Sequence, residues 1–236
     1  MKTRVDVGPG SAQPSTGNAV CRVEKVTKSF GRTILQDVSL ELSAGELLAI
    51  KGASGSGKST LLNILGLLDQ ADSGRIELFG RAAPGPGSRG AMLLRRHRIG
   101  YLFQSFALID TDTVDANLRV AQRYAVGSGG QLRQAREAAL DRVGLADMGK
   151  QRVYELSGGE QQRLAVARLL VKGRDLVLAD EPTGSLDPTN RDAVLSMLAD
   201  VASAGAAVVV VTHDQTVVDR CDRLLCLPNR RLPATI

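Results

Sequence analysis

Gly52-Ala53-Ser54-Gly55-Ser56-Gly57-Lys58-Ser59 is the stretch that decides the fold of this 236-residue chain. It satisfies the pattern G-x-x-x-x-G-K-[ST] and lies between an apolar run at 47–50, which predicts a buried strand, and an apolar stretch at 58–68, which predicts a helix. Glycines let backbone N–H groups approach phosphate oxygens closely, and a helix start favours negative charge. The stretch therefore predicts a phosphate-binding loop of an α/β protein, with a merely flexible Gly/Ser turn as the alternative.

Individual roles follow from this loop geometry. We expect Lys58 to reach the β- and γ-phosphates of a nucleotide, and Ser59 to offer its hydroxyl to Mg²⁺. The predicted nucleotide-binding residues of this segment are Gly52, Ala53, Ser54, Gly55, Ser56, Gly57, Lys58, Ser59 and Thr60.

A second candidate site follows the apolar run at 176–179, which ends in Asp180-Glu181-Pro182. Ligands of open α/β sheets bind at the carboxyl ends of the strands, where this acidic pair is expected to lie. We expect Asp180 to hold Mg²⁺ through water, and Glu181 to orient the attacking water and accept its proton. Taken alone, such a pair is equally typical of a surface turn.

Hydrophobic patterning places these motifs in one fold. Continuous apolar runs at 176–179 and 206–211 are typical of strands covered on both faces of a parallel sheet. Helical spacing at 131–143 predicts that the middle of the chain is helical. We therefore expect a P-loop NTPase core with a parallel sheet, and a helical subdomain inserted at about 105–170. Further expectations are a flexible tail at 1–19, a domain at 20–236, strands at 38–42 and 76–79, and a surface loop at 81–90.

Composition excludes several classes of protein. The formal charge is +5, hydrophobic residues make up 43% and charged residues 23%, which argues against disordered, collagen-like and coiled-coil chains. With only seven aromatic residues, this mild positive charge does not indicate nucleic-acid binding. No apolar stretch is long enough for a spanning helix, and the N-terminus lacks the apolar core of a signal peptide. The three cysteines, Cys21, Cys221 and Cys226, predict buried thiols instead of a disulfide framework or zinc site.

A third motif narrows the class of nucleotide enzyme. Leu156-Ser157-Gly158-Gly159-Glu160-Gln161-Gln162-Arg163 contains a capping box, Ser157-x-x-Glu160, at the start of an apolar helix. Such a helix start presents amides and a hydroxyl to an anion. The segment resembles the signature of ABC-type ATPases, and the chain from residue 20 onward fits their pattern, including antiparallel β elements near the N-terminus. A plain helix cap is the alternative.

The resemblance implies a site completed by two chains. In ABC ATPases the signature of one subunit faces the ATP held by the phosphate loop of another, so two ATPs lie in a head-to-tail dimer. By this analogy Ser157 and Gly159 contact the γ-phosphate of ATP bound to the second copy. The implied cofactors are ATP and Mg²⁺.

Four further positions match the family pattern. Phe30 resembles the aromatic residue that stacks on adenine, with a core Phe as the alternative. Gln104 resembles the glutamine that touches Mg²⁺ and the attacking water, and His213 the histidine that contacts the γ-phosphate. Their alternatives are a polar loop residue and a core histidine. Asp187 resembles a coupling residue at the dimer interface, or it simply terminates a turn, whereas His97 lies in a basic run at 95–98 that is typical of a solvated face.

Two features of the family pattern are absent. Many members carry a proline before the signature and another before the Asp-Glu strand, whereas this chain has neither at 151–155 or 172–175. Neither position has a catalytic role. The chain also continues only briefly past His213, so no added regulatory domain is expected.

The resemblance predicts a motor subunit. The ATP-hydrolysing motifs occur once and without a membrane span, so we expect a homodimer bound to integral membrane permease subunits at the cytoplasmic face, without nucleic acid. The segments 63–69, 99–108 and 178–187 are similar to ATPases of the lipoprotein-release, macrolide-export and antimicrobial-peptide-export branch, with bacteriocin export as the narrower hypothesis. A non-transport ABC ATPase that signals to envelope or cell-wall enzymes is the alternative, and a role in DNA repair is disfavoured because no long coiled-coil insertion is present.

Overall fold

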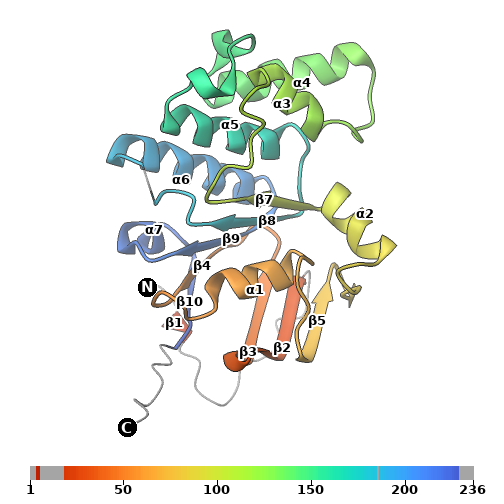
Figure 1. Ribbon diagram of the computed structural model, residues 1–236, viewed down its shortest axis with the longest axis vertical. Helices are drawn as coiled ribbons and strands as arrows, with labels where there is room; N and C mark the ends of the chain where they lie inside the picture. The colour runs from red at the N-terminus through yellow and green to blue at the C-terminus, as the bar shows by residue number, and fades with distance from the viewer. Residues whose placement is uncertain (1–3, 6–18, 185, 229–236) are drawn as a thin grey trace.

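The computed structural model describes residues 4–5, 19–184 and 186–228, which form two β-sheets with helices around them (Figure 1). The chain is an α/β protein, as the sequence predicts. The strands of the parallel sheet, in spatial order, are β1 (Arg4–Val5), β10 (Arg223–Cys226), β4 (Leu47–Lys51), β9 (Ala207–Thr212), β8 (Leu176–Asp180) and β7 (Ile99–Leu102). The antiparallel sheet contains β3 (Arg32–Ser43), β2 (Ala19–Phe30), β5 (Ser73–Leu78) and β6 (Arg81–Ala82).

The helices fall into two groups (Figure 1). One group covers the sheets and the other forms a separate helical layer beyond β7. The first comprises α1 (Lys58–Leu65), α2 (Arg89–His97), α6 (Pro188–Ser203) and α7 (Gln215–Asp219). The second comprises α3 (Val114–Ala121), α4 (Gly129–Arg142), α5 (Gly158–Leu170) and two 3₁₀ turns, η1 (Ala146–Met148) and η2 (Val153–Glu155).

Burial explains why β9 is apolar from Ala207 to Val211. Val209 and Val211 face the core shared with α1 and the antiparallel sheet. Val208 and Val210, on the opposite face of the strand, pack with residues of α6 and α7. Since successive side chains of a strand point to opposite faces, a strand covered on both sides needs apolar residues throughout.

The helical layer has a core of its own. Val114 and Leu118 of α3, Leu140 of α4 and Leu164 of α5 are buried in one cluster, separate from the two clusters that flank the parallel sheet. Helix α5 also contributes Ala165, Val166 and Leu169 to the core beside the parallel sheet, so it connects the helical layer to the sheet.

The structure differs from the sequence expectations at three segments. Arg4 and Val5, expected in a flexible tail, pair in parallel with Leu224 and Leu225 of β10, and β2 begins at Ala19; residues 6–18 lie outside the described part. The helix expected at 58–68 ends at Leu65, where the Gly66 amide donates to Leu62 and closes the last turn. The loop expected at 81–90 contains β6 and the start of α2, whose amide at Ala91 is capped by the Ser88 hydroxyl.

The carboxyl ends of four parallel strands meet at one edge of the sheet. Residue pairing places Lys51 of β4 opposite Thr212 of β9, and Val211 of β9 opposite Asp180 of β8. Ala179 of β8 lies opposite Leu102 of β7. The phosphate loop and the segments after β7, β8 and β9 therefore begin at the same edge.

Cys21 and Cys221 are buried, as expected, whereas Cys226 is partly exposed. Within the described ranges, each helix is too short or too polar to cross a lipid bilayer.

Candidate functional site

The phosphate loop has the tight backbone that the motif predicts. Gly55 and Gly57 adopt positive φ angles of 78° and 92°, which glycine adopts without strain. A β-carbon on Gly52 would lie 2.3 Å from the Ser56 hydroxyl, and one on Gly57 would lie 2.6 Å from the Leu35 side chain. Larger residues at Gly52 and Gly57 would therefore displace the loop.

The loop provides unsatisfied groups that suit an anion. The hydroxyl oxygen of Ser56 is buried and has no hydrogen-bond partner among the described residues, an arrangement that a phosphate oxygen would satisfy. Helix α1 begins directly after the loop and has no acidic residue in its own first turn, so no side chain of that turn compensates its positive end. The Lys58 ammonium donates to the carbonyls of Gly52 and Ala53, at 2.9 and 3.1 Å, so it already lies against the loop. These features fit a phosphate chain.

Two oxygen ligands for Mg²⁺ lie side by side. The Ser59 hydroxyl donates to Oδ1 of Asp180 at 3.3 Å. Among the described residues, no cluster of three or more His, Cys, Asp or Glu side chains could hold a metal by itself. This donor set fits Mg²⁺, which commonly binds one or two carboxylates together with phosphate oxygens and water.

Burial raises the pKa of Asp180, and the neighbouring charge of Glu181 adds to this effect. The hydrogen bond from Ser59 and the charge of Lys58 act in the opposite direction. The carboxylate is thus held in an environment that disfavours its charge, and a bound cation would relieve this cost.

Glu181 and His213 form a pair at the same edge. Nδ1 of His213 lies 2.9 Å from Oε1 of Glu181. The Glu181 side chain is only 16% exposed, whereas that of His213 is 72% exposed, so His213 is not a core histidine. Glu181 has a positive φ of 45° and its amide donates to the Val211 carbonyl. A left-handed conformation at a non-glycine residue is costly and concentrates at functional positions.

The remaining sequence candidates, Phe30, Gln104 and Asp187, are all exposed. Phe30 ends β2, is 58% exposed, and lies under the Lys28 ammonium, which is 4.8 Å from its ring centre, so it is not a core residue. Gln104 is exposed two residues after β7. Asp187 caps α6 by accepting from the amides of Thr189 and Asn190, and Ser185 lies outside the described residues.

The signature segment lies on the helical layer, at the start of α5. The Ser157 hydroxyl accepts from the Glu160 amide, while the Glu160 carboxylate accepts from the Ser157 amide at 2.8 Å. Hydrogen bonds from Ser157 lower the pKa of Glu160. The predicted capping box is confirmed, and Ser157 and Gly158 remain exposed.

Sequence reasoning missed the contacts of the basic run at 95–98. His97 is exposed as expected, but its neighbours are not simply solvated: the Arg96 guanidinium lies 3.7 Å from the Tyr124 ring centre, and that of Arg98 lies 3.7 Å from the Phe79 ring centre. Sequence reasoning also missed Asn190 and Arg191, which bind Arg163 of α5 and Asp214, the N-cap of α7. Asp187-Pro188 carries the signal of a helix start, which predicts α6 but not these partners.

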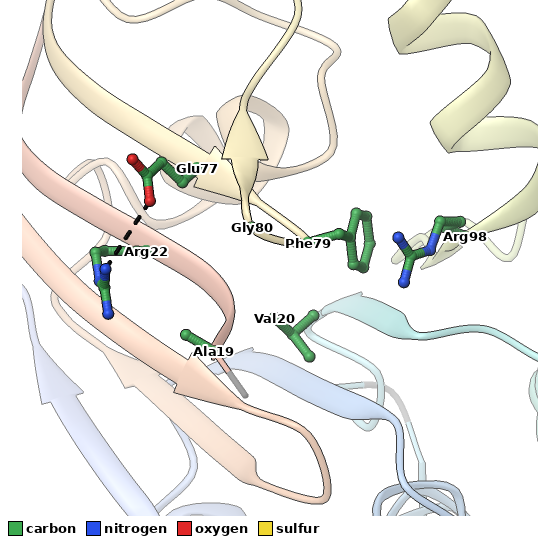
Figure 2. Close-up of a pocket in the computed structure, with 7 residues that line it drawn as sticks. All are labelled: Ala19, Val20, Arg22, Glu77, Phe79, Gly80 and Arg98. Atoms are coloured by element: carbon green, nitrogen blue, oxygen red, sulfur yellow. Dashed lines mark ion pairs between the residues drawn. The ribbon is translucent and has the colours of Figure 1, made fainter. Parts of the chain in front are cut away.

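A separate pocket of about 410 Å³ lies away from the phosphate loop. Figure 2 shows it between Ala19 and Val20 at the start of β2, Glu77 and Gly80 around the end of β5, and Phe79 facing Arg98. Phe30 marks the opposite end of β2. The chemistry of the candidate site thus belongs to the carboxyl edge of the parallel sheet and not to this pocket.

Residues 35–184 match the family described as "ABC transporter". The chain is 38% identical over 226 residues to the "Macrolide export ATP-binding/permease protein MacB 2" of Yersinia pestis bv. Antiqua (strain Antiqua), covering 94% of this chain and 33% of that protein. It is 42% identical over 207 residues to the "Pyoverdine export ATP-binding/permease protein PvdT" of Pseudomonas syringae pv. tomato, covering 85% and 31%. The chain therefore spans about a third of the length of these relatives.

Solved structures agree with the sequence relatives. The "Dimeric Structure of MJ0796, a Bacterial ABC Transporter Cassette" superposes with a TM-score of 0.80 at 33% identity, covering 88% of this chain and 94% of the other. A post-hydrolysis state of the same cassette bound to ADP and Pi gives a TM-score of 0.79 at 33% identity, with the same coverage of both chains. On the family match, the relatives and the fold, this chain belongs to the ABC transporter family and has the fold of its ATP-binding cassette.

Proposed function

We propose that this chain hydrolyses ATP as the motor subunit of a membrane transporter, acting as a head-to-tail homodimer at the cytoplasmic face. The observation that carries the proposal is the convergence of Lys58, Ser59, Asp180 and the Glu181–His213 pair at one edge of the sheet. These contacts support a site in which phosphate-binding, metal-binding and proton-accepting groups act together.

The hydrolytic step uses these groups in sequence. The loop amides and Lys58 hold the phosphates, and Glu181 orients a water molecule and accepts its proton as the water oxygen bonds to the γ-phosphorus. The bond between the γ-phosphorus and the bridging oxygen breaks, giving ADP and phosphate. General base catalysis of this kind contributes about 10² to 10⁴ in rate. Mg²⁺, held by Ser59, Asp180 and Gln104, would neutralise phosphate charge.

His213 keeps the base in position. Its ring nitrogen bonds the Glu181 carboxylate, which fixes one oxygen and leaves the other available to water. The exposed remainder of the ring can then reach the γ-phosphate. Phe30, which is exposed at the end of β2, offers a flat face for the adenine ring.

The second copy supplies the other wall of the site. Ser157 and Gly158 are exposed at the start of α5, where amides and a hydroxyl suit an anion, yet they belong to the helical layer. We propose that Ser157 and Gly159 meet the γ-phosphate bound by the partner chain. The dimeric form of a 33% identical cassette supports this arrangement.

A groove lies between the sheet and the helical layer, and it fits a segment of a membrane subunit. We propose that the helical layer is a subdomain at about residues 105–170. The groove has a volume of about 290 Å³ and is lined by apolar side chains that include Leu68, Phe103 and Val120, each more than a third exposed. The relatives named as ATP-binding/permease proteins are about three times longer than the matched region. Their names support a permease segment as the occupant of this groove.

Charge indicates what kind of segment the groove binds. Arg95, Arg168, Lys172 and Arg174 line it, and within the described ranges none forms an ion pair with a carboxylate. Burial lowers the pKa of Arg168, and it lowers that of Arg174 to about 10 although Asp175 opposes the change. We therefore propose an amphipathic permease segment with acidic side chains, because its carboxylates would compensate these cations.

The test of this docking is copurification from membranes. Lys172→Glu should reduce recovery of the permease several-fold while ATP turnover of the isolated chain stays unchanged. Lys150→Glu, at an exposed position outside the groove, serves as the matched control. Equal recovery with both variants would contradict the groove assignment.

The cargo is proposed at the level of the family branch: a peptide or bacteriocin, a lipoprotein or a drug. The relatives named for macrolide and pyoverdine export favour export over envelope signalling. Identifying the copurified permease and counting its spans tests this, since a subunit with too few spans to form a path would favour signalling.

A further inference from the structure

The first turn of α6 makes contacts in two directions. Asn190 and Arg191 are consecutive residues, and consecutive side chains of an α-helix point about 100° apart. Asn190 binds residues of the signature helix α5, whereas Arg191 binds the residue that follows His213. One turn of helix therefore touches both halves of the proposed catalytic arrangement.

Asn190 joins Asp187, the N-cap of α6, to the signature helix. Its side-chain amide donates to Oδ2 of Asp187 at 2.5 Å, and its carbonyl oxygen accepts from the Arg163 guanidinium. A β-carbon on Gly159 would lie 2.8 Å from Cγ of Asn190, so the signature glycine packs directly against this side chain. Movement of Asn190 would therefore displace the start of α5 or break these bonds.

Arg191 joins the same turn to the segment after β9. Its guanidinium donates to Oδ2 of Asp214 at 3.3 Å, and the Asp214 carboxylate also caps α7 by accepting from the Thr216 amide. The Thr216 amide and the charge of Arg191 both lower the pKa of Asp214. Asp214 directly follows His213, and His213 binds Glu181, the proposed base. A shift of Arg191 would therefore move His213 relative to Glu181.

We propose that Asn190 and Arg191 are positioning residues that link occupation of the signature, by the second copy's nucleotide, to the placement of His213 against Glu181 in the same chain. The inference rests on the proposed head-to-tail ATPase. A rigid, capped helix start is suited to the task because Asp187 fixes the amides of Thr189 and Asn190 at 3.0 Å each. Neither residue contacts substrate in this account.

The decisive variants break each link and keep the local helix caps. Asp214→Asn removes the charge that binds Arg191 but retains a good N-cap for α7. Asn190→Asp keeps an acceptor for Arg163 but removes the donor to Asp187 and places two carboxylates together. Arg142→Ala is the matched control, because it breaks a different ion pair to α6, with Asp200 at 3.1 Å near the end of the helix.

Steady-state ATP hydrolysis and light scattering of the purified chain supply the readouts. We expect Asp214→Asn and Arg191→Ala to lower kcat about tenfold, as small misplacements of catalytic groups do, with KM for ATP within twofold of wild type. Asn190→Asp should lower kcat and also raise the chain concentration needed for ATP-dependent dimers. Arg142→Ala should leave kcat, KM and dimer formation unchanged.

A double-mutant cycle separates linkage from general destabilisation. If Arg191 acts through Asp214, the Arg191→Ala/Asp214→Asn double variant loses no more kcat than the worse single variant. Wild-type kcat in both single variants, losses that multiply in the double variant, or equal loss in Arg142→Ala would overturn the inference. Each of these results would overturn the inference while the wild-type protein still hydrolysed ATP. If the proposed function were wrong, the wild-type protein itself would not hydrolyse ATP.

Discussion

Nδ1 of His213 lies 2.9 Å from Oε1 of Glu181, although the two residues follow different strands and are separated by 32 positions. The parallel register of β8 and β9 creates this pair, because Asp180 and Val211 lie opposite each other at the ends of their strands. In the proposed function, the largely buried Glu181 carboxylate is the base and the exposed His213 imidazole is its orienting partner.

Removing the charge of Glu181 tests the base directly. We expect Glu181→Gln to bind ATP normally, to lower turnover by a factor of about 10² or more, and to accumulate ATP-bound dimers. Radiolabelled ATP hydrolysis and light scattering with ATP and Mg²⁺ measure these effects. A variant that remains monomeric under these conditions would count against the two-chain site.

Lys58→Ala tests the phosphate loop. The Lys58 ammonium now donates to the Gly52 and Ala53 carbonyls, so its loss frees the loop and removes the cation that would face the phosphates. We expect ATP turnover to become undetectable, with little change in the thermal midpoint of the apo protein. Hydrolysis at the wild-type rate would contradict the assignment of the loop.

Ser157→Arg tests action by the second copy. The serine is exposed on the helical layer and caps α5, so an arginine there blocks the surface that the partner's nucleotide would meet. We expect hydrolysis to be lost while each chain still binds ATP, as a fluorescent nucleotide titration would show. If binding and hydrolysis fell together, the signature would instead serve the nucleotide of its own chain.

The buried carboxylate of Asp180 is expected to lower the stability of the protein at neutral pH, although the proposed activity requires it. Burial raises the pKa of Asp180 in the folded state, so folding favours the protonated carboxyl. The resulting contribution to the free energy of unfolding is fully present below the unfolded pKa of about 4. It is lost as pH rises through the folded pKa. Asp180→Asn should therefore have a higher thermal midpoint than wild type at pH 7 without nucleotide, and the difference should shrink toward pH 4. Differential scanning calorimetry across this range measures it.

The same variant should lose ATP turnover, and it should lose the stabilisation by Mg²⁺ and ATP that we expect for wild type. Wild type and Asp180→Asn with equal midpoints at every pH would show that burial of this carboxylate has no cost. Ser59, which donates to Asp180, provides the control: Ser59→Ala should lower the apo midpoint, since it removes a hydrogen bond that favours the charged form.

Local patterns were sufficient to predict the parts of the fold that position the site. The apolar run of β9 and the glycines of the phosphate loop each have one physical explanation: burial on both faces, and backbone geometry that a β-carbon would disrupt. The capping box at Ser157 is equally local, because its partner Glu160 lies three residues away.

Other features depend on contacts that no local pattern encodes. Arg4–Val5 is too short to show a period of two, and pairs only because β10 offers a free edge at that place. The start of α2 was not predicted because it follows a Pro/Gly-rich segment, although Ser88 is a typical N-cap residue. The partners of Asn190 and Arg191 lie 27 and 23 positions away, so only the packing of α5, α6 and α7 reveals them.

The central claim is that one chain holds the nucleotide and a second chain completes its site. ATP turnover per chain, measured over a wide range of chain concentrations with light scattering at each point, tests this most directly. We predict that turnover per chain falls toward zero as dilution converts dimers to monomers, and reaches a plateau when dimers saturate. Constant turnover per chain in samples shown to be monomeric would contradict the account.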